Sequence, residues 1–468
     1  MHIEQIYTGC LAQGAYYIRS GNEAAIIDPL RETSPYITRA EKDGVKIKYI
    51  FETHFHADFV SGHIDLAGKT GATIVFGPNA STAYSSYSAK DGEEFKIGSI
   101  TIKVLHTPGH TMESSTFLLL DENKKPHCIF SGDTLFIGDV GRPDLAVKSN
   151  LTSEDLAGML FDSLQTKIKT LPDDVIVYPA HGAGSACGKN MSKETYDTLG
   201  NQKLKNYALI IQDRNKFIKE LTTGILPPPQ YFPKNALLNK SGYAEFDEVM
   251  KKGNNALSPD MAEDFVNNNG AIILDVRKAN EFAAGHVPNS IFIGIDGQFA
   301  PWVGTLISDL QQPIVLVAPK GREEEIITRL SRVGYDNCLG YIDGGIDAWK
   351  NAGKEVSTVK SISASEFSGC LNNKINVLDV RKPGEYASRH LENVENYPLD
   401  FINNWNSSLD KNKEYHIHCA GGYRSMITAS ILKARGFQNV IDIEGGFSAI
   451  QNTNVKLTDP ITCSKSNA

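Results

Sequence analysis

The chain has 468 residues, of which 41% are hydrophobic and 22% charged, and its formal net charge is −8. This is the composition of a globular protein of about three domains, and it excludes global disorder. The charge gives no reason to expect binding to nucleic acid or to an anionic membrane. No apolar run approaches the ~20 residues that span a bilayer, and the N-terminus lacks the basic start and apolar core of a signal peptide. We therefore expect a cytoplasmic protein.

The seven cysteines are scattered along the chain and form no C-x-x-C pair. A disulfide framework and a structural zinc ribbon are therefore both unsupported. Each cysteine is by default a small buried hydrophobe, and a chemical role for one of them needs support from its neighbours.

Residues 1 to about 220 alternate short apolar segments with polar or glycine-rich loops. Segments such as AAIID, KYIFE, TFLLL and VIVYP predict strands with polar side chains at their ends. We expect a large, sheet-dominated α/β domain whose functional groups lie in the strand-end loops.

Four of these loops carry histidine and aspartate. The sequences are THFHADF, HTPGHT, SGDTL and PAHG, and the residues are His54, His56, Asp58, His110, Asp133 and His181. Unpaired polar groups that converge in one place are costly to bury, and a metal ion is their natural partner. The sequence therefore predicts a metal site.

The order THxHxD, TPGHT, GDTLF and PxHG resembles the metallo-β-lactamase superfamily over residues 1 to about 220. The resemblance implies an αββα sandwich with the metal at one edge of the two sheets. It also implies two metal positions that share an aspartate: the first draws on His54, His56, His110 and Asp133, and the second on Asp58, the residue after it, His181 and Asp133.

Phe59 stands where the hydrolytic members of that superfamily have a metal ligand. A phenyl ring cannot coordinate, so a second cation is left with too few ligands and a two-zinc hydrolytic site is disfavoured. Two histidines and one carboxylate are the facial triad that holds non-haem Fe(II) and activates oxygen. We predict one Fe(II) per chain on His54, His110 and Asp133. The other members of the cluster then orient the ligands or bond metal-bound water: His56, Asp58 and His181.

Within the superfamily this pattern resembles the persulfide dioxygenases, which oxidise glutathione persulfide or other thiol persulfides. The loop GDVGRPDL, residues 138–145, also resembles that subgroup. Two roles are open for Arg142: it binds a substrate carboxylate or sulfur oxyanion, or it pairs with Asp144 and pins the loop. Two roles are also open for Cys187, a small packed residue or a redox-active thiol at the site.

A proline-containing segment, residues 222–257, follows the first domain, and its composition predicts an extended, stiff linker. Beyond it the sequence repeats: IILDVRKANEFAAGHV (272–287) and NVLDVRKPGEYASRHL (376–391) match in one register. Buried strands alternate with amphipathic helices in both copies. This predicts tandem α/β domains with parallel sheets, the first repeat (residues 258–355) and the second repeat (residues 356–468).

The second repeat contains HIHCAGGYRS, in which a strand ends at Cys419 and a helix follows. A thiol at such a turn faces backbone N–H groups and the positive end of the helix dipole. Both lower the pKa of a thiol and stabilise negative charge on sulfur. The residues of this loop that we expect to bind substrate are Gly421, Gly422, Tyr423, Arg424 and Ser425.

Together with the LDVR and EGG signatures, this loop resembles the rhodanese (sulfurtransferase) family over about 360–455. The family's mechanism implies that Cys419 takes up a sulfane sulfur as a persulfide and passes it on. A cysteine phosphatase loop needs one more residue between its cysteine and arginine, so it is disfavoured. In the first repeat, Ala318 stands in place of the cysteine and three glutamates follow it, so we expect a structural spacer or docking module.

The whole chain resembles bacterial multidomain enzymes of sulfide detoxification. The resemblance implies that iron and O2 oxidise a low-molecular-weight thiol persulfide to sulfite, and that sulfite accepts the sulfur on Cys419 to give thiosulfate. Two alternatives remain: a two-metal thioester hydrolase of the glyoxalase II type, and a metal-free sulfur-carrying or redox scaffold. The sequence identifies neither the carrier thiol nor whether the chain forms a homo-oligomer.

Overall fold

The computed structural model describes residues 1–146, 151–371 and 375–459. The chain divides into two compact units, Met1–Val249 with Thr328–Asp336, and Met250–Ile327 with Asn337–Ala468. Within the described residues, no helix has the length and apolarity that a bilayer crossing requires.

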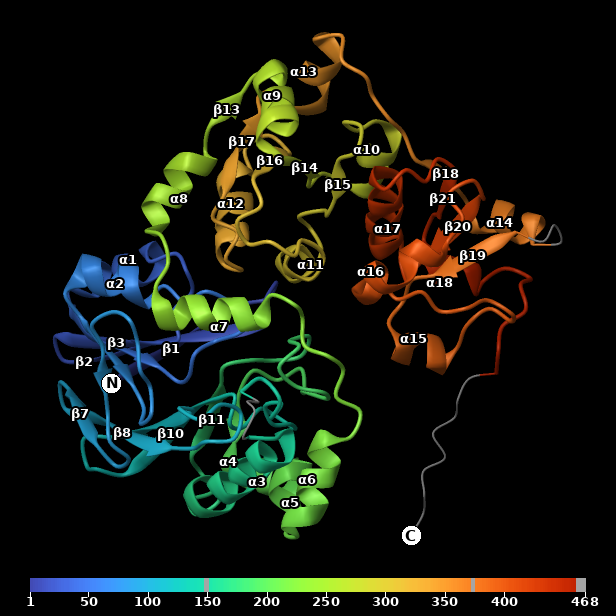
Figure 1. Cartoon of the computed structure of the whole chain (residues 1–468). Coiled ribbons are helices and arrows are strands. Elements are labelled where there is room, and N and C mark those ends of the chain that lie inside the picture. Colours follow the sequence, from blue (N-terminus) through green and yellow to red (C-terminus); the bar gives the residue numbers. More distant parts are fainter. Residues whose placement is uncertain (147–150, 372–374, 460–468) are drawn as a thin grey trace. The chain divides into compact units, whose positions relative to one another are not determined.

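The first unit contains two six-stranded mixed sheets (Figure 1). The first has the order β1-β2-β3-β4-β5-β6, with bounds β1 (His2–Thr8), β2 (Gln13–Ser20), β3 (Glu23–Ile27), β4 (Lys46–Glu52), β5 (Thr73–Phe76) and β6 (Tyr87–Ser88). The second has the order β12-β11-β10-β9-β8-β7, with bounds β7 (Glu94–Ile97), β8 (Ile100–His106), β9 (Ser115–Leu120), β10 (Pro126–Gly132), β11 (Ile176–Pro179) and β12 (Asp197–Thr198).

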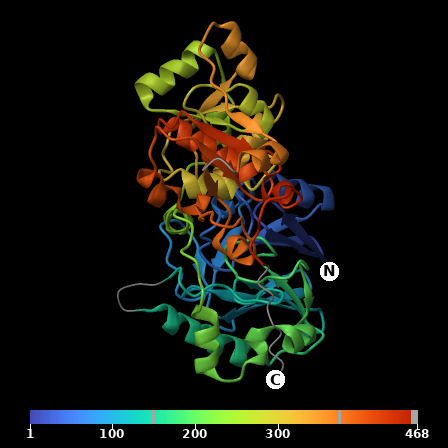
Figure 2. The ribbon, with the colours of Figure 1, turned by 90° about the vertical axis from the view of Figure 1, so that its right-hand side faces the viewer.

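Successive side chains of a strand point to opposite faces of its sheet, as the pleat requires. In β2, Tyr16 and Ile18 belong to the core between the sheets, whereas Ala15 and Tyr17 pack with residues of α1 and α2. Further helices cover the second sheet, shown in green in Figure 2. The helices are α1 (Ser34–Asp43), α2 (His63–Thr70), α3 (Ser153–Ser163), α4 (Leu199–Lys205), α5 (Tyr207–Ile210) and α6 (Arg214–Thr222). The predicted αββα sandwich is confirmed.

The segment 222–257 differs from the extended linker expected from its prolines. Residues 225–229 are irregular, but α7 (Phe232–Ser241) and α8 (Phe246–Gly253) follow. Pro233 lies in the first turn of α7, where its missing N–H costs no helical hydrogen bond. Because Asn239 of α7 bonds to the backbone of the first unit, this helix is part of that unit.

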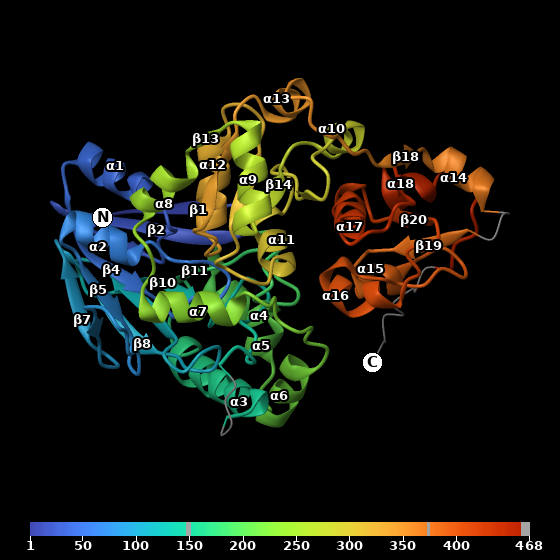
Figure 3. The same ribbon diagram turned by 45° about the horizontal axis from the view of Figure 1, so that its top comes forward.

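The second unit contains two parallel sheets, as the repeat predicts (Figure 3). The first repeat has the order β13-β17-β16-β14-β15, with strands β13 (Ala256–Leu257), β14 (Ile272–Asp275), β15 (Ile291–Phe292), β16 (Ile314–Val317) and β17 (Cys338–Ile342). Its helices are α9 (Pro259–Asn269), α10 (Ala279–Ala284), α11 (Phe299–Leu306), α12 (Glu323–Ser331) and α13 (Gly345–Asn351).

The second repeat has the strand order β18-β21-β20-β19. Its elements are β18 (Lys360–Ile362), α14 (Ala364–Cys370), β19 (Asn376–Asp379), α15 (Pro383–Ser388), α16 (Ile402–Trp405), β20 (Tyr415–His418), α17 (Tyr423–Ala434), β21 (Val440–Ile443) and α18 (Gly446–Ile450). β20 ends just before Cys419, and β16 ends just before Ala318. The two residues therefore occupy equivalent places in the two repeats.

Candidate metal centre and thiol loop

Three buried side chains converge at strand ends of the first unit. His54 follows β4, His110 follows β8 and Asp133 follows β10, and their ligand atoms all lie within 4.8 Å of one another. The Nε2 atoms of His110 and His54 lie 3.3 and 4.0 Å from Asp133 Oδ2. Neither carboxylate oxygen of Asp133 has a hydrogen-bond partner among the described residues. A buried carboxylate without partners is costly, so this donor set fits a cation.

The hydrogen bonds of the two histidines leave Nε2 free on each ring. His110 Nδ1 lies 2.8 Å from the carbonyl oxygen of Arg142, which can only accept, so Nδ1 carries the proton. Thr53 Oγ1 donates its single proton to Asp28 Oδ2, and it therefore accepts from His54 Nδ1 at 2.9 Å. Such outer partners fix the tautomer of metal-binding histidines. Burial and the neighbouring histidines also lower the pKa of His54 well below its usual range, which keeps the ring neutral.

His56 is turned toward two buried carboxylates. Its Nε2 lies 3.1 Å from Asp28 Oδ1 and 3.6 Å from Glu52 Oε2, and its ring stacks on Phe59 with 4.3 Å between centroids. Burial lowers the pKa of His56, but Asp28 and Glu52 outweigh it and the pKa reaches about 9. This geometry favours the predicted orienting role over a ligand role.

Asp58 and His181 form a second polar group beside the first. His181 Nε2 lies 3.4 Å from Asp58 Oδ2 and 3.5 Å from Asp133 Oδ1. Ligand atoms of Asp58, His181 and His56 all lie within 4.8 Å of one another. Cys187 also lies within 4.8 Å of Asp133 and His181, and it is buried. Burial, followed by the two carboxylates, raises the pKa of its thiol well above the usual range. The structure thus places Cys187 beside the candidate metal centre.

The Arg142 guanidinium is already occupied by protein groups. It donates to both oxygens of Asp144, at 2.6 and 2.7 Å, and to the carbonyl oxygens of Ala186 and Leu226, at 3.2 and 2.5 Å. Of the two roles left open by the sequence, these bonds favour the one that pins the loop. A substrate role for Arg142 stays a prediction.

Four polar residues around the centre were not singled out from the sequence. Asp28 follows β3, and this strand-end carboxylate was an available signal. Glu52 and His63 lie near His56, with His63 Nδ1 3.4 Å from Glu52 Oε1. Asn239 of α7 donates to the carbonyls of His56 and Phe59, both at 2.8 Å. No local pattern marks Asn239, because its partners lie far away in the sequence.

Gly141 packs directly against two of the candidate ligands. A Cβ at this position would lie 2.2 Å from the Asp133 carbonyl oxygen and 2.9 Å from His110 Nδ1. We expect Gly141→Ala to displace the His110 ring and to lower metal affinity about 10- to 100-fold, the range for loss of a supporting partner. The measurement is metal content after dialysis against a graded chelator. Gly68→Ala is the control, since a Cβ there meets nothing within 4 Å. Unchanged retention in Gly141→Ala would refute the expectation.

The second chemical site is the loop after β20. Cys419 is 1% exposed, and the backbone N–H of Gly422 donates to its Sγ at 3.1 Å. Gly422 has φ = +101°, a conformation that favours glycine. Ser425 Oγ lies 3.6 Å from Sγ, and α17 begins at Tyr423. The loop therefore places the Cys419 sulfur beside a backbone amide donor and the N-terminus of α17.

The EGG signature supports this loop from the opposite side. The amides of Phe447 and Ser448, at the start of α18, donate to the carbonyls of Cys419 and Ala420 at 2.7 and 2.9 Å. A Cβ on Gly446 would lie 2.4 Å from the Cys419 carbonyl oxygen, so only glycine allows this approach. These two loop carbonyls therefore accept hydrogen bonds from the start of α18.

Two of the expected substrate contacts have protein partners. Arg424 makes a bidentate ion pair with Glu385 at 2.6 and 2.8 Å. The Tyr423 hydroxyl donates to the Gly294 carbonyl oxygen of the first repeat at 2.7 Å. Gly421 is exposed at the loop surface. Substrate binding by these residues stays a prediction.

Comparison with known families matches three segments of the chain. The metallo-β-lactamase superfamily matches residues 8–181, and the rhodanese-like domain matches residues 258–352 and 363–453. The chain is 30% identical over 213 residues to human mitochondrial persulfide dioxygenase ETHE1, across 45% of this chain and 76% of the relative. It is 33% identical over 170 residues to a hydroxyacylglutathione hydrolase of Tolumonas auensis, across 36% of this chain and 60% of the relative.

A solved structure extends this likeness beyond the first domain. The metallo-β-lactamase structure from Staphylococcus aureus is 33% identical, with a TM-score of 0.66, and the match covers 73% of this chain and 98% of that one. The relatives, the two matched families and the sandwich with its ligand cluster agree with one another. The chain therefore belongs to the metallo-β-lactamase superfamily and carries, after its metallo-β-lactamase domain, two rhodanese-like domains.

Proposed function

We propose that the chain is an iron-dependent persulfide dioxygenase coupled to a sulfurtransferase. A low-molecular-weight thiol persulfide, O2 and water give sulfite, the free thiol and two protons. Sulfite then takes a second sulfane sulfur from Cys419 and leaves as thiosulfate. The observation that carries the proposal is the convergence of His54, His110 and Asp133, whose carboxylate has no hydrogen-bond partner among the described residues, with Phe59 in place of a further ligand. The relation to ETHE1 supports it.

The residues around the first site prepare the two imidazoles and keep the site dry. Bound by His54, His110 and Asp133, Fe(II) would supply the activation of O2. Thr53 and the Arg142 carbonyl hold the imidazole rings so that both Nε2 atoms face Asp133. The fully buried Phe59 ring excludes water next to His56.

The transfer step uses the loop around Cys419. The thiolate attacks the outer sulfur of the persulfide, the sulfur–sulfur bond of the carrier breaks, and the carrier leaves as a thiolate. Sulfite then attacks the outer sulfur on Cys419, which regenerates the Cys419 thiolate. Because the Gly422 N–H donates to Sγ, it stabilises the sulfur while it carries negative charge.

Metal analysis combined with oxygen uptake tests the proposal. Purified protein is expected to hold one iron per chain and to consume O2 when glutathione persulfide is added. Two tightly bound zinc ions with thioesterase activity would contradict it, and a metal-free chain would indicate a sulfur-carrying scaffold.

A two-metal thioester hydrolase is the second candidate. The group of His56, Asp58 and His181 favours it, because these side chains supply further ligand atoms beside Asp133. The relation to the Tolumonas hydrolase also supports it. The metal count and a thioester substrate such as lactoylglutathione separate the two candidates.

The first repeat is expected to carry no sulfur during the reaction. Ala318 has no thiol, and Cys338 is buried, which raises its pKa to about 12. We expect no added sulfur on peptides of residues 258–352 when a Cys419→Ser chain is incubated with thiosulfate and examined by mass spectrometry. A sulfur adduct in that range would show that the first repeat takes part in the chemistry.

A further inference from the structure

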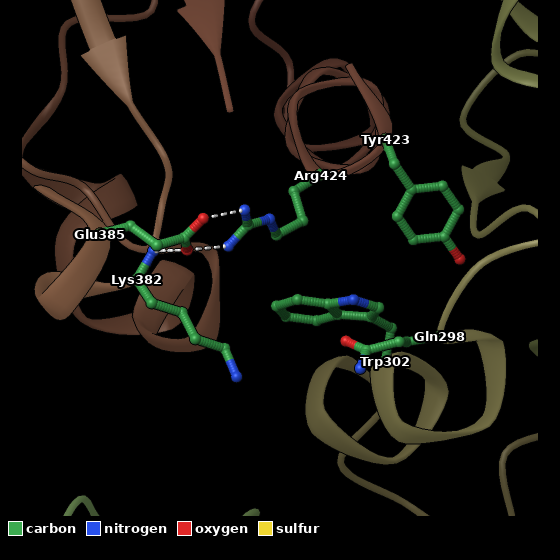
Figure 4. Close-up of a pocket in the computed structure, with 6 residues that line it drawn as sticks. All are labelled: Gln298, Trp302, Lys382, Glu385, Tyr423 and Arg424. Atoms are coloured by element: carbon green, nitrogen blue, oxygen red, sulfur yellow. Dashed lines mark hydrogen bonds and ion pairs between the residues drawn. The ribbon is translucent and has the colours of Figure 1, made fainter. Parts of the chain in front are cut away.

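A cavity next to the Cys419 loop is lined by both repeats. Its volume is about 280 Å³, and it lies beside the start of α17 (Figure 4). The first repeat contributes two lining residues, Trp302 of α11 and Gln298, which directly precedes that helix. The second repeat contributes four: Lys382, Glu385, Tyr423 and Arg424.

The two repeats are in direct contact at this cavity. The Tyr423 hydroxyl donates to the Gly294 carbonyl oxygen at 2.7 Å, and the Phe292 amide donates to Ser430 Oγ at 3.0 Å. A Cβ on Gly297 would lie 2.3 Å from the Tyr423 ring, so the first repeat fits closely around this side chain. Since Tyr423 precedes Arg424 in the Cys419 loop, the first repeat forms a wall of the space that this loop faces.

The lining offers an aromatic face and an unpaired cation. Arg424 is neutralised by Glu385, whereas Lys382 is exposed and its Nζ has no hydrogen-bond or ion-pair partner among the described residues. Trp302 is 4% exposed, and Figure 4 shows its ring and the Lys382 side chain beside the same space. An indole ring and an ammonium group together favour an anionic ligand that also has an apolar or flat part.

The volume of the cavity favours an organic ligand over an inorganic anion. At ~30 Å³ for each water molecule in the liquid, the volume corresponds to roughly nine waters. Sulfite or thiosulfate alone would leave most of this space unfilled. Pockets for organic ligands range from about 300 to 1,000 Å³, and this cavity, at about 280 Å³, lies just below the lower end of that range. The cavity is therefore close in size to a site for a small organic molecule.

We propose that this cavity binds the organic carrier of the sulfane sulfur, a low-molecular-weight thiol with a carboxylate group, and that the first repeat supplies Trp302 and Gln298 to recognise it. The carrier lies against Trp302 and pairs with Lys382 while its outer sulfur is transferred to Cys419. The first repeat then acts as a specificity element for the second. This proposal rests on Cys419 being the sulfur acceptor.

The test compares two sulfur donors with the full-length chain. Glutathione persulfide has an organic carrier, whereas thiosulfate has none, and the readout is the ratio of kcat/KM for the two donors. We expect Lys382→Gln to lower this ratio about two- to fivefold, as for an exposed ion pair, and Trp302→Ala to lower it about tenfold. The loss should lie in KM, because the Cys419 loop is unchanged.

Lys278→Gln is the matched control, because Lys278 occupies the same position in the first repeat and is also exposed. It should leave the ratio at the wild-type value. If Trp302→Ala fails to fold, the ratio is measured in Trp302→Phe and Lys382→Gln instead. An unchanged ratio in Lys382→Gln and in the folded Trp302 variant would overturn the proposal. A wild-type chain that takes sulfur from neither donor would instead reject the role of Cys419, and this proposal with it.

Discussion

Replacing Asp133 with alanine is expected to remove the metal ion and to abolish oxygen uptake, while sulfur transfer by Cys419 continues. The carboxylate lies between the Nε2 atoms of His54 and His110, and its oxygens have no other hydrogen-bond partner among the described residues. Loss of a supporting partner alone costs about 10- to 100-fold in metal affinity, and loss of a ligand should cost more than about 100-fold. Metal content, oxygen consumption with glutathione persulfide, and thiosulfate–cyanide transfer are the three measurements.

Asp58→Asn provides the comparison for Asp133→Ala. Asp58 is itself a member of the second group, with its Oδ2 3.4 Å from His181 Nε2, and it lies outside the three predicted ligands. With a single metal, iron should remain bound in Asp58→Asn. A chain that loses one of two metal ions in this variant would support the hydrolase instead, and oxygen uptake by Asp133→Ala at the wild-type rate would reject the assigned ligand set.

Replacing Cys419 with serine should separate the two chemical steps. An alcohol is a far poorer nucleophile toward sulfane sulfur than a thiolate, so enzymatic thiosulfate formation should fall to background. Serine is close to cysteine in size, and the loop carbonyls remain bound to Phe447 and Ser448. Oxygen uptake should therefore persist while the product shifts from thiosulfate to sulfite. Chromatographic analysis of sulfite and thiosulfate over time measures this shift.

Two further variants serve as controls for Cys419→Ser. Cys370→Ser, a half-buried cysteine of α14 in the same repeat, should behave as wild type. His110→Ala should abolish oxygen uptake but leave transfer from a persulfide to added sulfite. Because sulfite and excess persulfide can form thiosulfate without enzyme, a protein-free reaction is needed. Thiosulfate at the wild-type rate from Cys419→Ser would make Cys187 the leading candidate for the second catalyst.

The sequence located the candidate site residues whose place depends on local position. His54, His110 and Asp133 follow strands, and strand ends can be located from apolar runs bounded by polar loops. Ala318 and Cys419 could be placed in equivalent positions because the repeat preserves strand length and register. The prolines of 222–257, in contrast, suggested an extended linker, whereas the segment contains α7, which packs against the first unit, and α8. Helix stability there comes from tertiary contacts more than from local composition.

The sequence by itself determined which residues can carry chemistry, that two domains are copies, and that one copy lacks its thiol. Only the tertiary structure decided what each polar side chain faces. His56 faces Asp28 and Glu52, Arg142 donates to Asp144 and two carbonyls, and Trp302 of one repeat lines the cavity beside Arg424 of the other. The physical reason is that strand and turn positions follow from short-range backbone preferences, whereas the orientation and charge of a buried polar group depend on partners that folding brings from distant segments.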